Sequence, residues 1–291
     1  MRLSTLAARC ASIAAGVFTA GRAFADDQLP ELPVIGAPVP GGMHFQQPVT
    51  GTMQSAVFLD NLLLWIIVPI TIFVTGLLIW CIVRYNQRAN PTPARFTHNT
   101  AIEVTWTIVP ILILFVIGAF SLPILFKDQT IPQADVTIKA TGYQWYWGYE
   151  YVDHDVEFSS FMLAREELEE NGYAQSEYLL ATDTAMVIPV NKTVVVQVTG
   201  ADVIHSWAMP SFGVKQDGVP GRLAELWFMA EEEGIYFGQC SELCGISHAY
   251  MPITVKVVSE GEYLAWLERQ GATNMAAAPG ADTLRVAAAA D

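Results

Sequence analysis

The chain has 291 residues, 52% of them hydrophobic, and its mean hydropathy is +0.34. This length accommodates one or two domains, and the apolar composition excludes a purely soluble protein, so part of the chain is expected to lie in a membrane. The net charge of −14 also argues against a nucleic-acid partner, because such binding needs a basic surface.

The N-terminal residues have the three regions of a secretory signal. Two arginines in the first nine residues supply positive charge, residues 11–20 form a small apolar run, and Ala-Phe-Ala at 23–25 offers a cleavage site. We therefore expect residues 1–25 to be a cleaved signal peptide and residues 26–56 to follow as an N-terminal segment outside the membrane. The alternative is that the signal remains as a short membrane anchor.

Two later segments are long and apolar enough to span a bilayer. Leu62 to Val83 and Val104 to Phe126 are almost free of charged residues. The loop between them, residues 84–100, carries three arginines and no acidic residue, so the positive-inside rule places it in the cytoplasm. A helical hairpin is expected over residues 57–126, with both termini on the outer side.

The segment from residue 127 to 270 is expected to form a β domain. Short runs rich in Val and Ile are separated by Gly, Pro and Asn, as in a β-sandwich. These runs are Val136–Ala140, Met186–Val190, Thr193–Val198, Leu223–Phe228, Gly234–Gly238 and Pro252–Val258. Residues 165–175 are expected to form a solvated helical excursion and residues 260–270 a closing helix. Residues 271–291, rich in Ala, Gly and Pro, are expected to be a loose tail.

The most informative motif lies between two of the predicted strands. It places Cys240, Cys244, His248 and Met251 within one short loop, and His205 lies upstream, where alternating apolar residues predict the end of a strand. Thiolates, imidazoles and a thioether are ligands that favour copper. A mononuclear site of the blue-copper type uses a single thiolate, so two cysteines predict a dinuclear centre.

Three other interpretations of this loop remain open. Two cysteines this close could form a disulfide in an oxidising compartment. The spacing would also line one face of a helix, although Gly245 and Pro252 favour a loop. A zinc site could use the same Cys and His residues, but Met is a poor zinc ligand.

The complete motif resembles the copper-binding loop of subunit II of bacterial haem-copper cytochrome c oxidase. Three further segments carry the same resemblance: Gly142–Tyr151, Asp202–Trp207 and Val219–Arg222. The resemblance implies two transmembrane helices and a β-sandwich of cupredoxin type facing the periplasm. It also implies a location in the bacterial inner membrane, with both termini in the periplasm.

The resemblance assigns each ligand a role. Cys240 and Cys244 would bridge two copper ions in a copper-A centre. His205 and Met251 would complete one copper, and His248 would bind the other.

Two acidic residues gain further roles from the resemblance. Glu242 would bind the second copper through its backbone carbonyl, and its carboxylate would reach a magnesium ion shared with subunit I; a solvent-exposed loop glutamate is the alternative. Glu103, at the cytoplasmic end of the second helix, would mark the mouth of a proton channel. Interfacial solvation would explain Glu103 equally well.

Charge and aromatic residues indicate a partner. The part of the chain from residue 127 onward carries the whole of the net negative charge, which predicts a cationic partner, although acidity alone would also keep the domain soluble. Basic cytochrome c fits this charge, with Glu150, Asp153, Asp155 and Asp202 as docking carboxylates. The resemblance makes Trp145 the residue through which the electron enters, whereas its alternating pattern alone is typical of core packing.

We therefore expect an electron-accepting subunit that passes electrons from cytochrome c to a haem-copper catalytic subunit, where dioxygen is reduced to water and protons are pumped. The expected partners are oxidase subunit I, the other oxidase subunits, cytochrome c and membrane lipid. A membrane-tethered copper carrier is an alternative, but such proteins expose Met or Cys pairs rather than a closed donor set. Quinol-oxidising relatives have lost the copper ligands that are present here.

Overall fold

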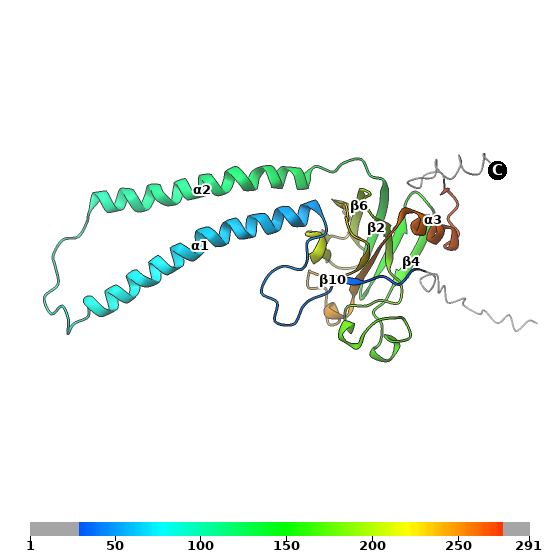
Figure 1. The fold of residues 1–291 in the computed structure, drawn as a ribbon, viewed down its shortest axis with the longest axis horizontal. Coiled ribbons are helices and arrows are strands. Elements are labelled where there is room, and N and C mark those ends of the chain that lie inside the picture. Colours follow the sequence, from blue (N-terminus) through cyan, green and yellow to red (C-terminus); the bar gives the residue numbers. More distant parts are fainter. Residues whose placement is uncertain (1–28, 276–291) are drawn as a thin grey trace, which may run out of the picture.

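The structure, a computed structural model that describes residues 29–275, consists of a long helical hairpin attached to a β domain (Figure 1). The hairpin helices are α1, Gly51–Arg84, and α2, Thr100–Gln129. The expected signal peptide and residues 276–291 of the expected tail lie outside the described residues.

Both hairpin helices begin at well-formed caps. Thr50 accepts a hydrogen bond from the backbone N–H of Met53 at 3.0 Å. Asn99 accepts one from Ile102, and the Glu103 carboxylate in turn accepts the N–H of Asn99 at 3.1 Å. Both predicted spans are confirmed as helices of membrane-spanning length, and both helices extend beyond the predicted apolar runs.

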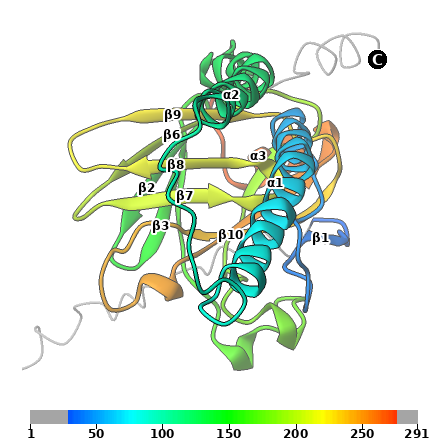
Figure 2. The ribbon, with the colours of Figure 1, turned by 90° about the vertical axis from the view of Figure 1, so that its left-hand side faces the viewer.

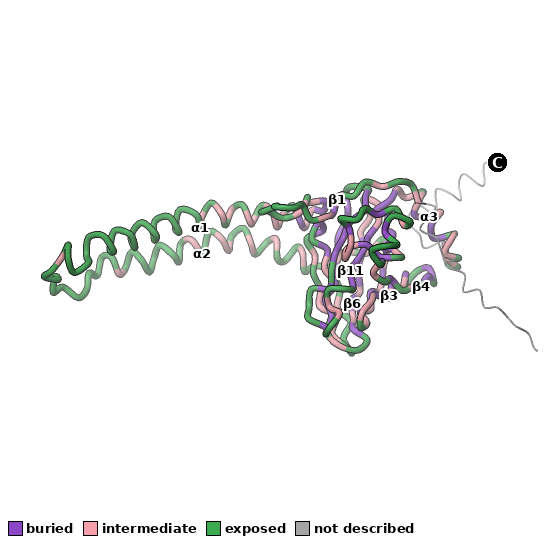
Figure 3. Tube along the Cα trace, turned by 90° about the horizontal axis from the view of Figure 1, so that it is seen from below, coloured by how far each residue is buried: buried purple, intermediate pink, exposed green. Residues whose placement is uncertain are grey.

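The hairpin and the β domain differ in burial. Within the described residues, the membrane-length windows of α1 and α2 are not buried, whereas the strands carry the buried core (Figure 3). Apolar side chains exposed along two helices in this way are suited to lipid or to neighbouring membrane helices.

The β domain contains two packed sheets. The first has the order β5–β11–β10–β7–β8, with β1 added on β10, and the second has the order β4–β3–β2–β6–β9. The first sheet comprises β5 Met186–Pro189, β11 Pro252–Val258, β10 Gly234–Cys240, β7 His205–Met209, β8 Val214–Gly218 and β1 Val34–Gly36. The second comprises β4 Val156–Ser160, β3 Tyr146–Tyr151, β2 Val136–Tyr143, β6 Val194–Gly200 and β9 Ala224–Phe228. Seen along the hairpin, several strands run across the helix axis (Figure 2).

Alternating burial explains how the two sheets form a common core. Every second residue of β2 and β3 is buried, as expected for strands with one face against the other sheet. Large aromatic residues such as Trp147, Trp207 and Tyr149 are fully buried in this core. The predicted strands are confirmed, but the aromatic run splits into a hairpin, because β2 ends at Tyr143 and β3 begins at Tyr146.

The excursion expected to be helical is not an α-helix. Residues 165–175 contain only a 3-10 turn at Arg165–Glu167, and a second begins at Gln175. Gly172 has a φ of +79°, which interrupts any continuing helix, and the side chains of Leu168 and Tyr173 turn inward to a small cluster on β10. The excursion is therefore a packed loop rather than a solvated helix.

The closing helix is confirmed as α3, Glu260–Arg269. Ser259 caps its first turn, and Tyr263, Leu264 and Leu267 bury its apolar face. Of the expected tail, residues 271–275 are described: Ala272 and Met275 pack against the core, and the Thr273 hydroxyl donates to Asp155 at 2.6 Å.

The first prediction concerns the close approach of β10 to β7. A Cβ at Gly238 would collide with the backbone carbonyl oxygen of Ala208, so Gly238→Ala should destabilise the β domain by about 2–3 kcal/mol. Thermal unfolding of the purified chain, followed by circular dichroism, measures this. Gly261→Ala is the control, since a Cβ there meets nothing within 4 Å and lies in a helix. Equal unfolding temperatures for Gly238→Ala and Gly261→Ala would show that the close approach of β10 to β7 does not exclude a side chain at Gly238.

Candidate metal centre

The loop that follows β10 carries four of the five predicted side-chain ligands. Cys240 is the last residue of β10, His248 begins a 3-10 turn, and Met251 directly precedes β11. Gly245 permits the turn between Cys244 and His248, because its φ of +119° is a conformation that L side chains rarely adopt. Cys240, Cys244 and Met251 are buried.

Strand register brings His205 to this loop. Cys240 pairs with Trp207 across the antiparallel β10–β7 pair, and His205 lies two residues earlier on the same face as Trp207. His205 begins β7, so the expectation that it lies at the end of a strand was wrong. Its ring lies against Gly142 of β2, where a Cβ would come within 2.7 Å of the imidazole.

The donor atoms converge at one end of the sandwich. The Sγ atoms of Cys240 and Cys244 are 3.9 Å apart. The Nδ1 atom of His205 lies 3.9 Å from Cys240 Sγ, and His248 Nδ1 and Met251 Sδ each lie 3.4 Å from Cys244 Sγ. The ligand atoms of His205, Cys240 and Cys244 all lie within 4.8 Å of one another.

The two thiols differ in acidity. Burial disfavours the Cys240 thiolate, but hydrogen bonds from His205 and from the neighbouring backbone outweigh it, and the pKa of Cys240 falls to about 7. Burial and the adjacent Cys240 charge raise the pKa of Cys244 to about 12. A cation that binds both sulfurs as thiolates must therefore displace a proton from Cys244.

Asp202 orients the His205 ring. The Nε2 atom of His205 donates to Asp202 Oδ1 at 2.8 Å, and this bond fixes the ring so that its Nδ1 atom faces Cys240. Burial opposes ionisation of both groups, but hydrogen bonds to Cys240 and Asp202 raise the pKa of His205. Hydrogen bonds from His205 and from the N–H groups of Val203 and Gln144 lower the pKa of Asp202. Sequence reasoning assigned Asp202 to docking and missed this contact.

A second set of hydrogen bonds holds the metal loop against the β2–β3 turn. The side chain of Gln144 donates to the carbonyl oxygen of Cys244 at 2.8 Å, and the Trp145 indole N–H donates to the same oxygen at 3.2 Å. The Trp147 indole donates to the Met251 carbonyl at 3.3 Å. Trp145 is half-buried, whereas Trp147 is fully buried. Spacing alone gave no sign of the role of Gln144.

The remaining predicted residues lie in different places. Glu242 is exposed in the metal loop, and its carbonyl oxygen lies 3.3 Å from Cys240 Sγ. Glu150 forms an ion pair with Lys139 at 2.8 Å. Asp153 and Asp155 lie in the β3–β4 turn, at the opposite end of β3 from Trp145, roughly 20 Å away by strand rise. The structure therefore does not bring these two next to the metal loop.

The cysteines of the loop are not joined in a disulfide. Cys240 and Cys244 are both free thiols in the described residues. The disulfide that the sequence left open is therefore not formed in this structure, and both thiols are available to a metal.

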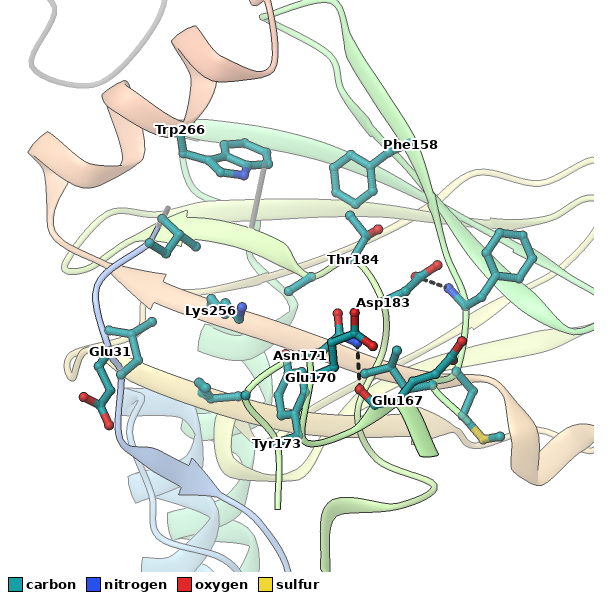
Figure 4. Close-up of a pocket in the computed structure, with 18 of the residues that line it drawn as sticks. Glu31, Phe158, Glu167, Glu170, Asn171, Tyr173, Asp183, Thr184, Lys256 and Trp266 are labelled. Atoms are coloured by element: carbon teal, nitrogen blue, oxygen red, sulfur yellow. Dashed lines mark hydrogen bonds between the residues drawn. The ribbon is translucent and has the colours of Figure 1, made fainter. Parts of the chain in front are cut away.

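A separate cavity lies beside the excursion and α3. It has a volume of about 780 Å³, and its lining includes Phe158, Trp266, Glu170, Asp183 and Lys256 (Figure 4). Its lining contains none of the predicted copper ligands. The metal centre and this cavity are therefore distinct features of the β domain.

Comparison with known families covers most of the chain. Residues 136–258 match the model of the periplasmic domain of cytochrome c oxidase subunit II, and residues 38–124 match the model of its transmembrane domain. These two matches coincide with the β domain and the hairpin.

Individual relatives agree with these matches. Cytochrome c oxidase subunit 2 of Cereibacter sphaeroides is 59% identical over 283 residues, which are 92% of this chain and 93% of the relative. The subunit 2 of Arabidopsis thaliana is 39% identical, over 79% of this chain and 90% of the relative. The crystal structure of the periplasmic domain of cytochrome oxidase subunit II from Bradyrhizobium japonicum is 52% identical, covers 49% of this chain and 97% of that chain, and gives a TM-score of 0.44. The chain belongs to the family of cytochrome c oxidase subunit II.

Proposed function

We propose that this chain is the electron-accepting subunit of a cytochrome c oxidase and that it holds two copper ions in a copper-A centre. When bound, this pair of ions supplies a one-electron acceptor that links cytochrome c to the haem-copper catalytic subunit, where dioxygen is reduced to water with proton pumping. The proposal depends on one observation, the convergence of three sulfur and two imidazole donor atoms at one end of the sandwich.

The chemistry of this donor set fits copper. Thiolate, thioether and imidazole together favour copper, whereas Met is a poor ligand for zinc. Both imidazoles direct Nδ1 toward a thiol sulfur.

The neighbours of each thiol support a dinuclear rather than a mononuclear centre. His205 and the Glu242 carbonyl lie beside Cys240, whereas His248 and Met251 lie beside Cys244. A mononuclear site with one thiolate would leave the second buried sulfur unused. Both sulfurs acting as bridges would use every donor.

The surrounding residues keep the donor atoms in place. Asp202 fixes the His205 ring, Gln144 and Trp145 hold the Cys244 carbonyl, and Trp147 holds the Met251 carbonyl. Ligands held by hydrogen bonds on a packed scaffold rearrange little when charge changes, and small rearrangement favours rapid electron transfer.

We propose Trp145 as the residue through which the electron enters. Its ring is partly exposed, and its indole N–H reaches the backbone of Cys244 at 3.2 Å. A single hydrogen bond thus connects a surface aromatic group to a ligand residue. This contact supports the proposed role in electronic coupling.

We propose cytochrome c as the donor, attracted by the acidic β domain. Among the predicted docking carboxylates, Asp202 lies beside the site and Glu150 lies on the same hairpin as Trp145. Asp153 and Asp155 lie at the far end of that hairpin, so their part in docking would be limited to long-range attraction. The partial exposure of Asp202 is compatible with both orienting His205 and contacting a cationic partner.

Two further assignments follow from the family. The exposed Glu242 carboxylate would bind a magnesium ion shared with subunit I. Glu103 would mark the mouth of a proton channel, although its hydrogen bond to the Asn99 N–H also gives it a local role in capping α2.

The proposed location is a bacterial inner membrane. The loop between α1 and α2 would lie in the cytoplasm because of its arginines, and the β domain in the periplasm. Residues 1–25 would act as the export signal.

The second prediction tests the dinuclear centre. Cys244→Ser should abolish the centre, because it removes a sulfur that both ions share, whereas Met251→Leu should retain copper with an altered reduction potential. Copper stoichiometry and electron paramagnetic resonance of the purified protein measure both effects. The unsubstituted protein should bind two coppers and give the hyperfine pattern of one electron shared by two nuclei. A single-nucleus pattern would identify a mononuclear site.

The third prediction separates positioning from docking at Asp202. Asp202→Asn should change the copper spectrum or potential as well as weaken cytochrome c binding, because Asn cannot accept hydrogen bonds through both side-chain atoms as Asp does. Glu150→Gln removes the same charge away from the ligands and should weaken binding only, more so at low salt. An unchanged spectrum in Asp202→Asn would leave docking as the sole role of Asp202.

The fourth prediction concerns Trp145. Trp145→Phe should slow electron uptake at saturating cytochrome c while leaving affinity and the copper spectrum nearly unchanged, because it removes the indole contact to Cys244. Stopped-flow mixing with reduced cytochrome c measures rate and affinity separately. Tyr146→Phe, which alters a neighbouring aromatic ring stacked outside the centre, is the control. Loss of affinity without loss of saturating rate would contradict the role.

A further inference from the structure

The loop between β1 and α1, residues 37–47, exposes an unusual amount of apolar surface. The exposed fractions of Val39, Met43 and Phe45 are 75%, 90% and 57%. We call this segment the apolar loop. Exposed apolar groups gathered on one short segment mark a contact with a partner or a membrane.

The apolar loop is held in place at both ends. Gly36, just before it, packs so closely on Tyr236 that a Cβ would come within 2.6 Å of the ring. At the other end, the Ser211 hydroxyl donates to the Gln46 side chain at 2.8 Å, and Val49 is buried. The loop is thus fixed to the β domain, and its apolar side chains point away from it.

A tight turn forms the tip of the apolar loop. The N–H of Gly42 donates to the Val39 carbonyl at 2.9 Å, and Gly41 has a φ of +75°. Pro40 followed by a glycine at positive φ is the pattern of a type II turn. The turn places Val39 at one side of the tip and Met43 at the other.

The apolar loop lies on the side of the β domain that faces the hairpin, next to the first turns of α1 (Figure 1). These turns are level with the outer end of α2, because the Thr52 hydroxyl contacts Asp128 at 3.4 Å and Phe58 packs on Phe120 with ring centroids 6.0 Å apart. The apolar run of α2 continues to Phe126. The loop therefore lies at the level where the membrane-spanning part of the hairpin ends.

The sequence around the apolar loop has the composition of a membrane interface. From Leu32 to Leu59 there is no Asp, Glu, Lys or Arg, although the chain as a whole carries a net charge of −14. A charged partner would need complementary charges here. Lipid headgroups and the outer ends of their acyl chains do not, and apolar and aromatic side chains are stabilised in that zone.

We propose that the apolar loop inserts into the outer interface of the lipid bilayer and acts as a third membrane contact beside α1 and α2. Val39, Met43 and Phe45 enter the boundary between headgroups and acyl chains. Because the loop is fixed to β1 and to the 3-10 turn Pro210–Phe212, this contact sets the tilt of the β domain relative to the membrane surface.

A nitroxide label tests this insertion in the assembled oxidase. Met43→Cys, in a Cys81→Ser background, is labelled in the copper-loaded complex and reconstituted into phosphatidylcholine vesicles; the complex without the added cysteine is the blank. Collisions with dissolved oxygen, which concentrates in lipid, are compared with collisions with a water-soluble nickel chelate. Glu166→Cys, exposed on the excursion, is the matched control.

Insertion predicts that the label at Met43 collides several-fold more with oxygen relative to nickel than the label at Glu166 does. Equal ratios would place the loop in water and overturn the proposal. Low accessibility to both reagents would mean that another subunit covers the loop, and it would overturn the proposal equally. A Phe45→Cys label repeats the comparison, so a local disturbance at Met43 cannot decide the outcome. None of these outcomes depends on the copper centre.

Discussion

The pairing of β10 with β7 is the constraint on which the rest of the centre depends. This register sets Cys240 opposite Trp207 and so brings the His205 ring beside the sulfur of Cys240, although His205 and Cys240 are far apart in sequence. The backbone bond from Ser241 to the Ser206 carbonyl at 3.0 Å continues the pairing past the strand end and directs the loop outward. A shift of one residue would turn His205 to the opposite face of the sheet.

Much of this architecture can be predicted from the sequence, because it depends on local sequence patterns. The two spans follow from apolar length, and the candidate metal-binding residues of the loop follow from soft donors placed close together between β-rich runs. The contact between Asp202 and His205 and the close approach of Gly142 depend on how separate strands meet, so no local pattern predicts them. The same reason hides Gln144, whose partner is a backbone atom.

The excursion shows why one local signal failed. Its glutamates favour a helix by propensity, but burial of Leu168 and Tyr173 against Phe237 competes with that propensity and prevails. Glu103 shows the opposite case. The family resemblance assigned it to the mouth of a proton channel, but its carboxylate also accepts the backbone N–H of Asn99 at the start of α2. Tertiary packing and capping thus determine what a charged side chain does as much as its position along the chain.

The strands run across the hairpin axis, and this direction has a consequence for assembly. The metal loop, orange in the sequence colouring, lies at the edge of the β domain that faces the membrane (Figure 1) and is displaced sideways from α1 and α2 (Figure 2). The centre therefore overhangs membrane that this chain does not itself occupy. A neighbouring subunit that fills this space would lie directly beneath the candidate metal-binding side chains.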